Sequence, residues 1–203
     1  MKNQRTYGEP SPAMLFIFTM LTIMFYGVST GFFDTSALLL LGVIQLGCFP
    51  AYLIGAITYL VKGDSINGNV FLIFATAFGG IGGGTNIVNY FMTTNGNPLD
   101  GRILGVVWLW CGLSVIPIVC GMLNGPLMPL IVFSVGAIQL IMSGLFDLGI
   151  LPDFFQTIIH MCYLIIAFGG FYCSLASLFG FSKIHVPLGK PLIAKKKEEL
   201  FNE

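Results

Sequence analysis

Charge is the property that this sequence lacks most. Only 9% of its 203 residues are Asp, Glu, Lys or Arg, and 56% are hydrophobic. A soluble domain carries about 25% charged residues, so this chain cannot cover its surface with charge, and most of it must face lipid. The net charge is zero, which excludes a bulk electrostatic attraction to nucleic acid.

Paired cysteines and catalytic clusters are missing as well. The five cysteines lie inside uncharged stretches, and no two of them have the C-x-x-C spacing that indicates a zinc site. The sequence contains no acid–base pair, group of metal ligands or nucleophile constellation of the kind that marks an active site. It therefore predicts that the protein is not an enzyme and has no catalytic residue, metal or cofactor.

The few charges that remain divide the chain into long uncharged runs. Asp, Glu, Lys and Arg are missing from residues 10–33, 35–61, 65–99, 103–146 and 154–182. A helix needs about 20 mostly apolar residues to cross the bilayer core. The first, second, third and fifth of these runs fit one helix each. The fourth run fits two helices separated by Asn124-Gly125-Pro126, because Gly and Pro interrupt helices.

The sequence thus predicts an all-α, polytopic membrane protein, in which a bundle of six transmembrane helices forms a single domain over residues 1–203. The predicted helices cover residues 13–31, 37–61, 70–92, 103–123, 127–146 and 155–179, and residues 180–203 form a cytoplasmic tail. We expect a multi-pass protein of the cell membrane, surrounded by lipid.

The basic residues predict the orientation of the bundle. An even number of helices places both termini on one side. That side holds eight of the nine Lys and Arg residues, and the opposite side holds Arg102 alone. Cytoplasmic loops carry the excess of Lys and Arg, so we expect both termini to be cytoplasmic.

The first helix opens with a distinctive segment, Glu9-Pro10-Ser11-Pro12-Ala13-Met14-Leu15. Pro is favoured at the first position of a helix, and Ser is a preferred N-cap, so the segment predicts a well-defined helix start. A capped N-terminus also presents free N–H groups and the positive end of the helix dipole, which suit a carboxylate.

This segment resembles the N-P-A-P-L-G-L motif at the start of helix one in the acetate uptake transporters, a family of acetate and succinate permeases. Further short segments resemble the same family in the same order along the chain. They are Gly31-Phe32-Phe33; Gly55, Tyr59 and Lys62-Gly63; Leu104-Gly105 and Gly112; Phe133-Ser134; Ile158-Ile159-His160 and Gly169-Gly170; and Pro187-Leu188-Gly189. Their collinearity extends the resemblance over nearly the whole chain.

The resemblance implies a homo-hexamer with a pore through each six-helix subunit, taking a small monocarboxylate such as acetate. In the family the pore narrows at a ring of apolar and aromatic side chains from helices one, three and five. On this chain the ring corresponds to Phe18, Phe74 and Val135. Such a ring gates by dewetting and excludes hydrated ions, because stripping water from a charge is costly.

Polar side chains within the predicted helices are candidates for the permeation path. No charged residue lies in the predicted membrane core, so a weakly anionic solute would rely on backbone dipoles and on side chains such as Thr76, Asn86 and Ser134. His160 is a candidate for proton coupling, because an ionisable group inside a membrane marks a functional site. The alternative is a neutral histidine that bonds to a neighbouring helix near the membrane surface.

Five glycines lie within Gly79–Gly84 of the third predicted helix. Each interior Gly costs a helix about 1 kcal/mol relative to Ala. One interpretation is a small-residue face, formed by Ala75, Gly79 and Gly83, that lets another helix approach closely. The other is a locally unwound helix whose freed carbonyls line a polar path together with Asn86.

These observations together predict a permease or channel for small monocarboxylates of the acetate type, with succinate as a further candidate solute. A channel for small uncharged amides such as urea is the first alternative, and its flux would not depend on pH. The second alternative is a membrane protein that binds a partner and has no pore. Swelling assays in liposomes distinguish it from both transport hypotheses.

The predicted orientation can be measured with reporter fusions. Green fluorescent protein fused after Glu203 should fluoresce, because the C-terminus should be cytoplasmic. Alkaline phosphatase fused to a chain truncated after Gly149, between the fifth and sixth predicted helices, should be active because that loop should lie outside. The opposite pattern of activities would contradict the orientation.

Overall fold

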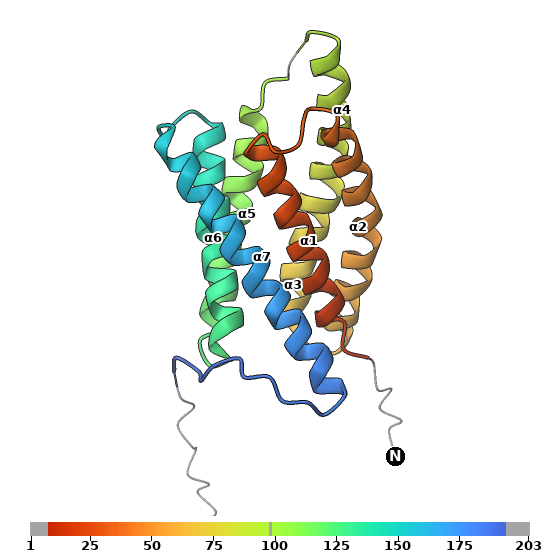
Figure 1. Ribbon diagram of the computed structural model, residues 1–203. Coiled ribbons are helices and arrows are strands. Elements are labelled where there is room, and N and C mark those ends of the chain that lie inside the picture. Colours follow the sequence, from red (N-terminus) through yellow and green to blue (C-terminus); the bar gives the residue numbers. More distant parts are fainter. Residues whose placement is uncertain (1–7, 98, 194–203) are drawn as a thin grey trace, which may run out of the picture.

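The computed structural model describes residues 8–97 and 99–193, and within these ranges it is all-helical with no strand. The elements are α1 (Ser11–Ser29), α2 (Ala37–Val61), α3 (Ser65–Phe74), η1 (Ala75–Gly82), α4 (Gly83–Thr94), α5 (Arg102–Gly121), α6 (Leu127–Asp147) and α7 (Phe154–Phe181). They form six helices in the described chain that are long and apolar enough to cross a membrane. The predicted all-α, six-helix membrane fold is confirmed (Figure 1).

The third membrane helix is composite and differs most from expectation. It runs without interruption from Ser65 to Thr94, whereas the sequence predicted residues 70–92. It begins earlier because the Asp64 side chain caps it, accepting a hydrogen bond of 3.0 Å from the Asn67 N–H. Its middle, η1, is a π-helix, a wider turn that is rare and often found at functional sites.

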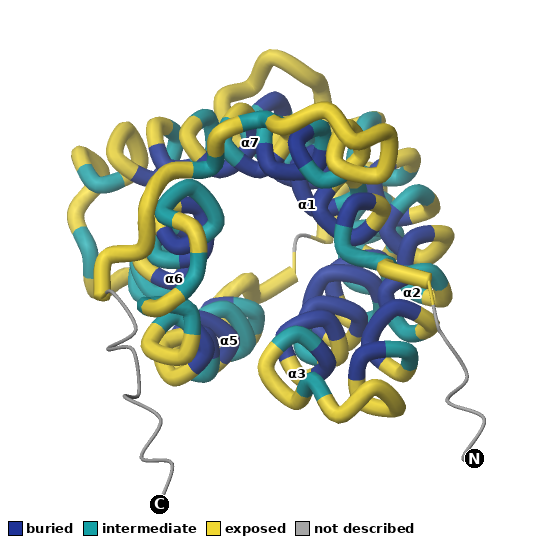
Figure 2. The backbone as a smooth tube through the Cα atoms, turned by 90° about the horizontal axis from the view of Figure 1, so that it is seen from below, coloured by how far each residue is buried: buried dark blue, intermediate teal, exposed yellow. Residues whose placement is uncertain are grey.

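Seen end-on, the six spans are arranged in a ring (Figure 2). Around this ring, α1 packs on α7, α7 on α6, α6 on α5, and α2 on the whole third span. The ring is loosely closed at two places, between α1 and α2 and between α3–η1 and α5, where the helices make few contacts. Most large apolar side chains that remain exposed lie on the outer faces of the helices, as expected for a protein surrounded by lipid.

Glycines set the closest helix pair, α5 and α6. A Cβ atom built on Gly144 would lie 2.5 Å from the Leu109 backbone nitrogen and 2.6 Å from the Gly105 carbonyl oxygen. One built on Gly105 would lie 2.8 Å from the Gly144 carbonyl oxygen. The backbones of α5 and α6 therefore touch at these positions, which small residues permit in membrane helices.

A close backbone contact at glycines also joins α2 to the third span, at the glycine run singled out in the sequence. Gly83 lies against the carbonyl of Gly42, and Gly79 lies against the backbone of Phe49. The run therefore provides a packing face, and η1 provides the departure from a regular helix. The close contacts agree with the packing interpretation, whereas the helix is not unwound at this run but continues through the π-helical η1.

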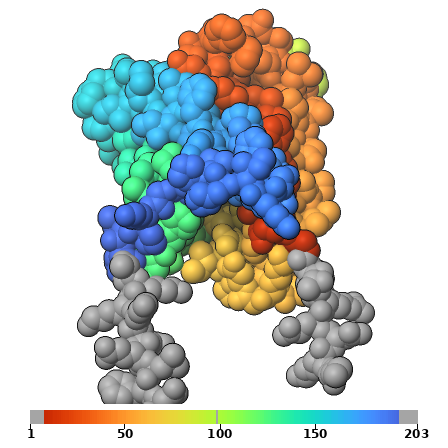
Figure 3. Space-filling view, turned by 60° about the horizontal axis from the view of Figure 1, so that its bottom comes forward, coloured from red at the N-terminus to blue at the C-terminus, as the bar shows by residue number. Residues whose placement is uncertain are grey.

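Residues 182–193 turn back along the end of the bundle where α1 begins. Backbone hydrogen bonds join Met128 N–H to the Leu188 carbonyl (2.9 Å) and Ile193 N–H to the Leu123 carbonyl (3.2 Å). Figure 3 shows this segment in dark blue, reaching from the end of α7 to the start of α6. The described ends of the chain thus share one end of the bundle (Figure 1). Lys195–Lys197, part of the predicted tail, lie outside the described residues.

The contact of α5 with α6 gives a stability prediction. Gly144→Ala should lower the free energy of unfolding by about 1–3 kcal/mol, because the added methyl meets backbone atoms that cannot move aside. Thermal unfolding in detergent measures the change.

Gly47→Ala on α2 is the matched control, since nothing lies within 4 Å of a Cβ atom at that position. It should leave the unfolding temperature unchanged or raise it. Equal stability of the two variants would show that α5 and α6 do not need this close approach.

Candidate functional site

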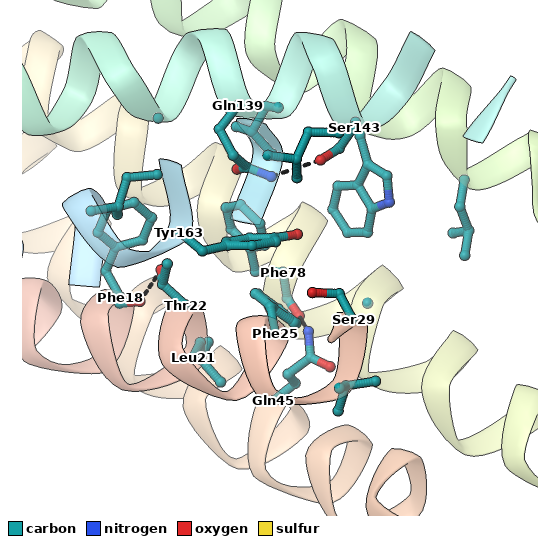
Figure 4. Close-up of a pocket in the computed structure, with 18 of the residues that line it drawn as sticks. Phe18, Leu21, Thr22, Phe25, Ser29, Gln45, Phe78, Gln139, Ser143 and Tyr163 are labelled. Atoms are coloured by element: carbon teal, nitrogen blue, oxygen red, sulfur yellow. Dashed lines mark hydrogen bonds between the residues drawn. The ribbon is translucent and has the colours of Figure 1, made fainter. Parts of the chain in front are cut away.

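A cavity of about 330 Å³ lies inside the ring of helices (Figure 4). Its walls are mainly apolar and aromatic, and polar side chains gather in one half of it. Among the described residues that line it, Asp147 alone carries a formal charge. A cavity of this size, mostly apolar with a few polar groups, is typical of a site for a small molecule.

The cavity runs from one end of the bundle to its middle. Ser29 ends α1, Asp147 ends α6, and Gln156 lies near the start of α7. These lining residues place one part of the cavity at the end opposite the described chain ends. Phe18, which lies near the middle of α1, lines the other part. The cavity is therefore a vestibule that extends from that end to the middle of the helices.

Three phenylalanines from three different helices meet at the inner end of the vestibule. The ring centroid of Phe18 lies 5.1 Å from that of Phe74 and 6.1 Å from that of Phe133, and the last two are 6.3 Å apart. Their planes differ by only 10–17°, and each side chain is buried. These three residues, here called the phenylalanine trio, lie together at the inner end of the cavity.

The trio contains two members of the ring predicted from the sequence, Phe18 and Phe74. Val135, the third predicted member, does not line the cavity and packs partly buried against the core. Phe133 takes its place on α6. Two residues along a helix correspond to a rotation of about 200°, so residues 133 and 135 cannot face the same side.

The predicted polar path divides between the cavity and other places. Asn86 and His160 line the vestibule, but Thr76 and Ser134 do not. Thr76 is exposed, and its hydroxyl donates to the Leu72 carbonyl (3.0 Å). It borders an open apolar groove between the third span and α5, together with Trp110.

A hydrogen-bonded amide pair anchors the polar half of the vestibule. Gln45 of α2 is fully buried; its Nε2 donates to the Phe78 carbonyl (2.6 Å), and its Oε1 accepts from Asn86 Nδ2 (2.6 Å). A Cβ atom at Gly82 would lie 2.6 Å from Gln45 Nε2, so only glycine leaves room for this amide. Gln45 thus fixes both the π-helical backbone and the Asn86 side chain.

The π-helical segment also keeps one face of the third span toward the cavity. Phe74, Phe78, Gly82 and Asn86 are spaced four residues apart, and all four line the vestibule. In a regular α-helix, three such steps would rotate the last residue by about 120° from the first. The wider turns of η1 offset this rotation, so aromatic and polar residues share a wall.

The histidine at the mouth has no hydrogen-bond partner on its inner nitrogen. His160 Nε2 is a buried atom without a partner in the described chain, and the His160 ring lies edge-on to Tyr26 at 5.9 Å. The described structure therefore gives His160 no bond from Nε2 to a neighbouring helix, and the side chain faces the vestibule.

The helix-start motif lies away from the vestibule. The Glu9 carboxylate accepts from the Ser11 N–H (3.2 Å), from the Tyr59 hydroxyl and from Lys62 Nζ (3.3 Å). Partial burial opposes ionisation, but these hydrogen bonds outweigh it and lower the pKa of Glu9 below its ordinary value. The chain's own carboxylate therefore occupies the anion-favouring helix start.

The N-cap of α1 also differs from the prediction. Pro10 is the capping residue, with no side-chain cap bond, and Ser11 is already the first helical residue. Pro12 and Leu15 are buried, and the Pro12 carbonyl accepts from the Ser174 hydroxyl of α7 (2.8 Å). In the structure this motif joins α1 to α2 and α7.

Several lining residues were not singled out in the sequence. Gln139 donates to the Ser143 hydroxyl (2.7 Å) within α6, and Trp108 stacks on Phe78 at 5.6 Å. Gln45 and Gln139 are glutamines inside charge-free runs, a signal that the sequence did contain. Asp147 lies at the mouth as the last residue of α6. In the described chain, no three His, Cys, Asp or Glu residues cluster as metal ligands.

Comparison with known proteins gives a structural match. No protein-family model matches the chain, and no curated protein matches it in sequence. A solved structure titled "Structure of the bacterial acetate channel SatP" superposes with a TM-score of 0.70 at 18% sequence identity, covering 91% of this chain and 100% of the other. The six-helix fold expected from the resemblance is thereby confirmed, and the fold of this chain is similar to that of the bacterial acetate channel SatP.

Proposed function

We propose that this protein is a permease or channel for small monocarboxylates of the acetate type. The observation that carries the proposal is the vestibule that ends on the phenylalanine trio, within a fold similar to that of an acetate channel. A vestibule closed by a narrow apolar constriction is the arrangement expected for a solute path through a helical bundle.

The vestibule wall suits weak binding of a small carboxylate. No Lys or Arg is among the described residues that line it, so no full positive charge would hold an anion in place. Instead of a positive charge, the wall offers an anion amide and hydroxyl groups, such as those of Asn86, Thr22 and Tyr163. Conduction requires binding that is favourable enough for entry and weak enough for release.

The phenylalanine trio supports selection by size and hydration. Its three rings are nearly parallel and buried, so they offer no hydrogen bond to a passing ion. A hydrated inorganic ion would lose its water there without compensation. A short carboxylate presents a methyl group to the rings.

A channel for small uncharged amides such as urea is the second candidate. The side-chain amides of Gln45, Asn86 and Gln139 at the vestibule, and the missing positive charge, favour it. Urea or acetamide flux that exceeds acetate flux and does not change with pH would select this candidate.

We propose further that both termini are cytoplasmic in the cell membrane and that six copies assemble. The lysine and arginine asymmetry supports the orientation, and the family resemblance supports the hexamer. Trp110 and Phe168, which are 68% and 69% exposed on α5 and α7, belong to outer faces that lipid or neighbouring copies would cover.

Filling the vestibule beside the trio should block transport. Gly136 lines the cavity, and a Cβ atom there would meet only the tip of the Phe18 ring, at 3.9 Å. Gly136→Leu should therefore fold while its side chain occupies the path, and acetate flux should fall close to that of empty liposomes. Uptake of labelled acetate into proteoliposomes at neutral pH, with and without an imposed pH gradient, measures this.

Gly47→Leu is the matched control, because its position on α2 is exposed and nothing lies within 4 Å of an added Cβ. Its flux should equal that of the wild type. Wild-type flux no greater than that of empty liposomes would refute the transport proposal, and unchanged flux in Gly136→Leu would place the path elsewhere.

Widening the trio should change which solutes pass. Phe18→Ala and Phe133→Ala each remove a ring from the constriction, so succinate flux should rise several-fold relative to acetate flux. Val135→Ala and Phe168→Ala should leave the ratio unchanged, because neither residue lines the cavity. Competition uptake with both labelled solutes gives the ratio. Equal effects in all four variants would show that the trio is not the filter.

A further inference from the structure

Tyr52 of α2 presents an unused hydroxyl at the inner part of the vestibule. The residue is fully buried, lines the cavity, and its Oη atom has no hydrogen-bond partner in the described chain. Buried polar groups in folded proteins almost always have a partner. A missing partner at a cavity wall therefore points to a group that enters from the cavity.

The Tyr52 ring is fixed, so the hydroxyl cannot turn to find another acceptor. It stacks on Phe71, with ring centroids 6.2 Å apart and planes 23° apart. It also lies edge-on to Phe74 of the trio, at 6.4 Å and 81°. Aromatic contacts of this geometry are favourable, and they hold the Tyr52 ring beside Phe74 of the trio.

Several other donors of the vestibule are already engaged with the protein. Thr22 donates to the Phe18 carbonyl (2.7 Å), and Gln139 donates to Ser143 (2.7 Å). The Gln45 and Asn86 amides bond to the Phe78 carbonyl and to each other. Within the described chain, the buried side-chain polar atoms without a partner are Tyr52 Oη and His160 Nε2, and both residues line this one cavity.

We propose that the Tyr52 hydroxyl donates a hydrogen bond to a carboxylate oxygen of the solute at the phenylalanine trio, and so forms an inner binding site. The inference rests on the proposed function and names one solute-binding group of that path. The ligand class is a short monocarboxylate, whose methyl group faces Phe18 and Phe74. A dicarboxylate would bring a second charged group to an apolar wall that has no donor for it.

The test removes one oxygen atom. Tyr52→Phe keeps the ring and its packing, so the empty protein should be as stable as the wild type or more stable. The half-saturating acetate concentration for uptake should rise about tenfold, the loss expected for one hydrogen bond to a charged group. The stabilisation of the protein by added acetate, measured by thermal unfolding in detergent, should weaken in parallel.

Tyr172→Phe is the matched control, because that hydroxyl donates to the Pro187 carbonyl (2.6 Å) and does not line the cavity. Its half-saturation should equal that of the wild type. Unchanged half-saturation in Tyr52→Phe, beside normal wild-type flux, would overturn the inference and leave the proposed function standing.

Two other results also overturn the inference. A Tyr52→Phe variant that is clearly less stable, or that fails to fold, would show that the hydroxyl has a structural partner. Absence of acetate flux in the wild type would overturn the proposed function and this inference together.

Discussion

The hydrogen bond from Gln45 to the Phe78 carbonyl is the contact on which the vestibule depends. In a lipid environment every backbone polar group needs an internal partner, and a π-helical turn changes the partners of its carbonyls. The side-chain amide of the buried Gln45 donates a hydrogen bond to the Phe78 carbonyl (2.6 Å). Its oxygen accepts a hydrogen bond from the Asn86 side chain (2.6 Å). Because Gly82 has no side chain, the amide reaches the backbone. One side chain thereby fixes the irregular helix and the polar wall.

This arrangement separates the tasks of the cavity. The phenylalanine trio comes from three helices and makes the inner end of the cavity apolar, whereas the amides of Asn86, Gln139 and Gln156 lie on the mouth side of it. The close glycine contacts, such as Gly105 with Gly144, lie outside the cavity and hold the helices that carry these groups. Helix packing and the cavity lining therefore use different faces of the same helices.

Much of the fold follows from the sequence because lipid imposes a simple rule: charge-free runs of sufficient length become spans. The site follows less completely. Phe18 and Phe74 line the cavity, but Phe133 rather than Val135 completes the trio, because a shift of two residues turns a side chain to the far side of its helix. Tyr52 could not be found by periodicity, since its significance is a hydroxyl without a partner, which only the packed structure reveals.

The π-helical segment also affects how this sequence aligns with the sequence of a protein of similar fold. A π-turn holds about one more residue than the α-turn it replaces. A relative with a regular third helix would thus be one residue shorter here, and an alignment without a gap inside the helix would pair residues out of register after Gly82. The collinear segments that resemble the acetate uptake transporters lie outside residues 64–103. A single inserted residue is enough to put the cavity-lining part of the third helix out of register in such an alignment.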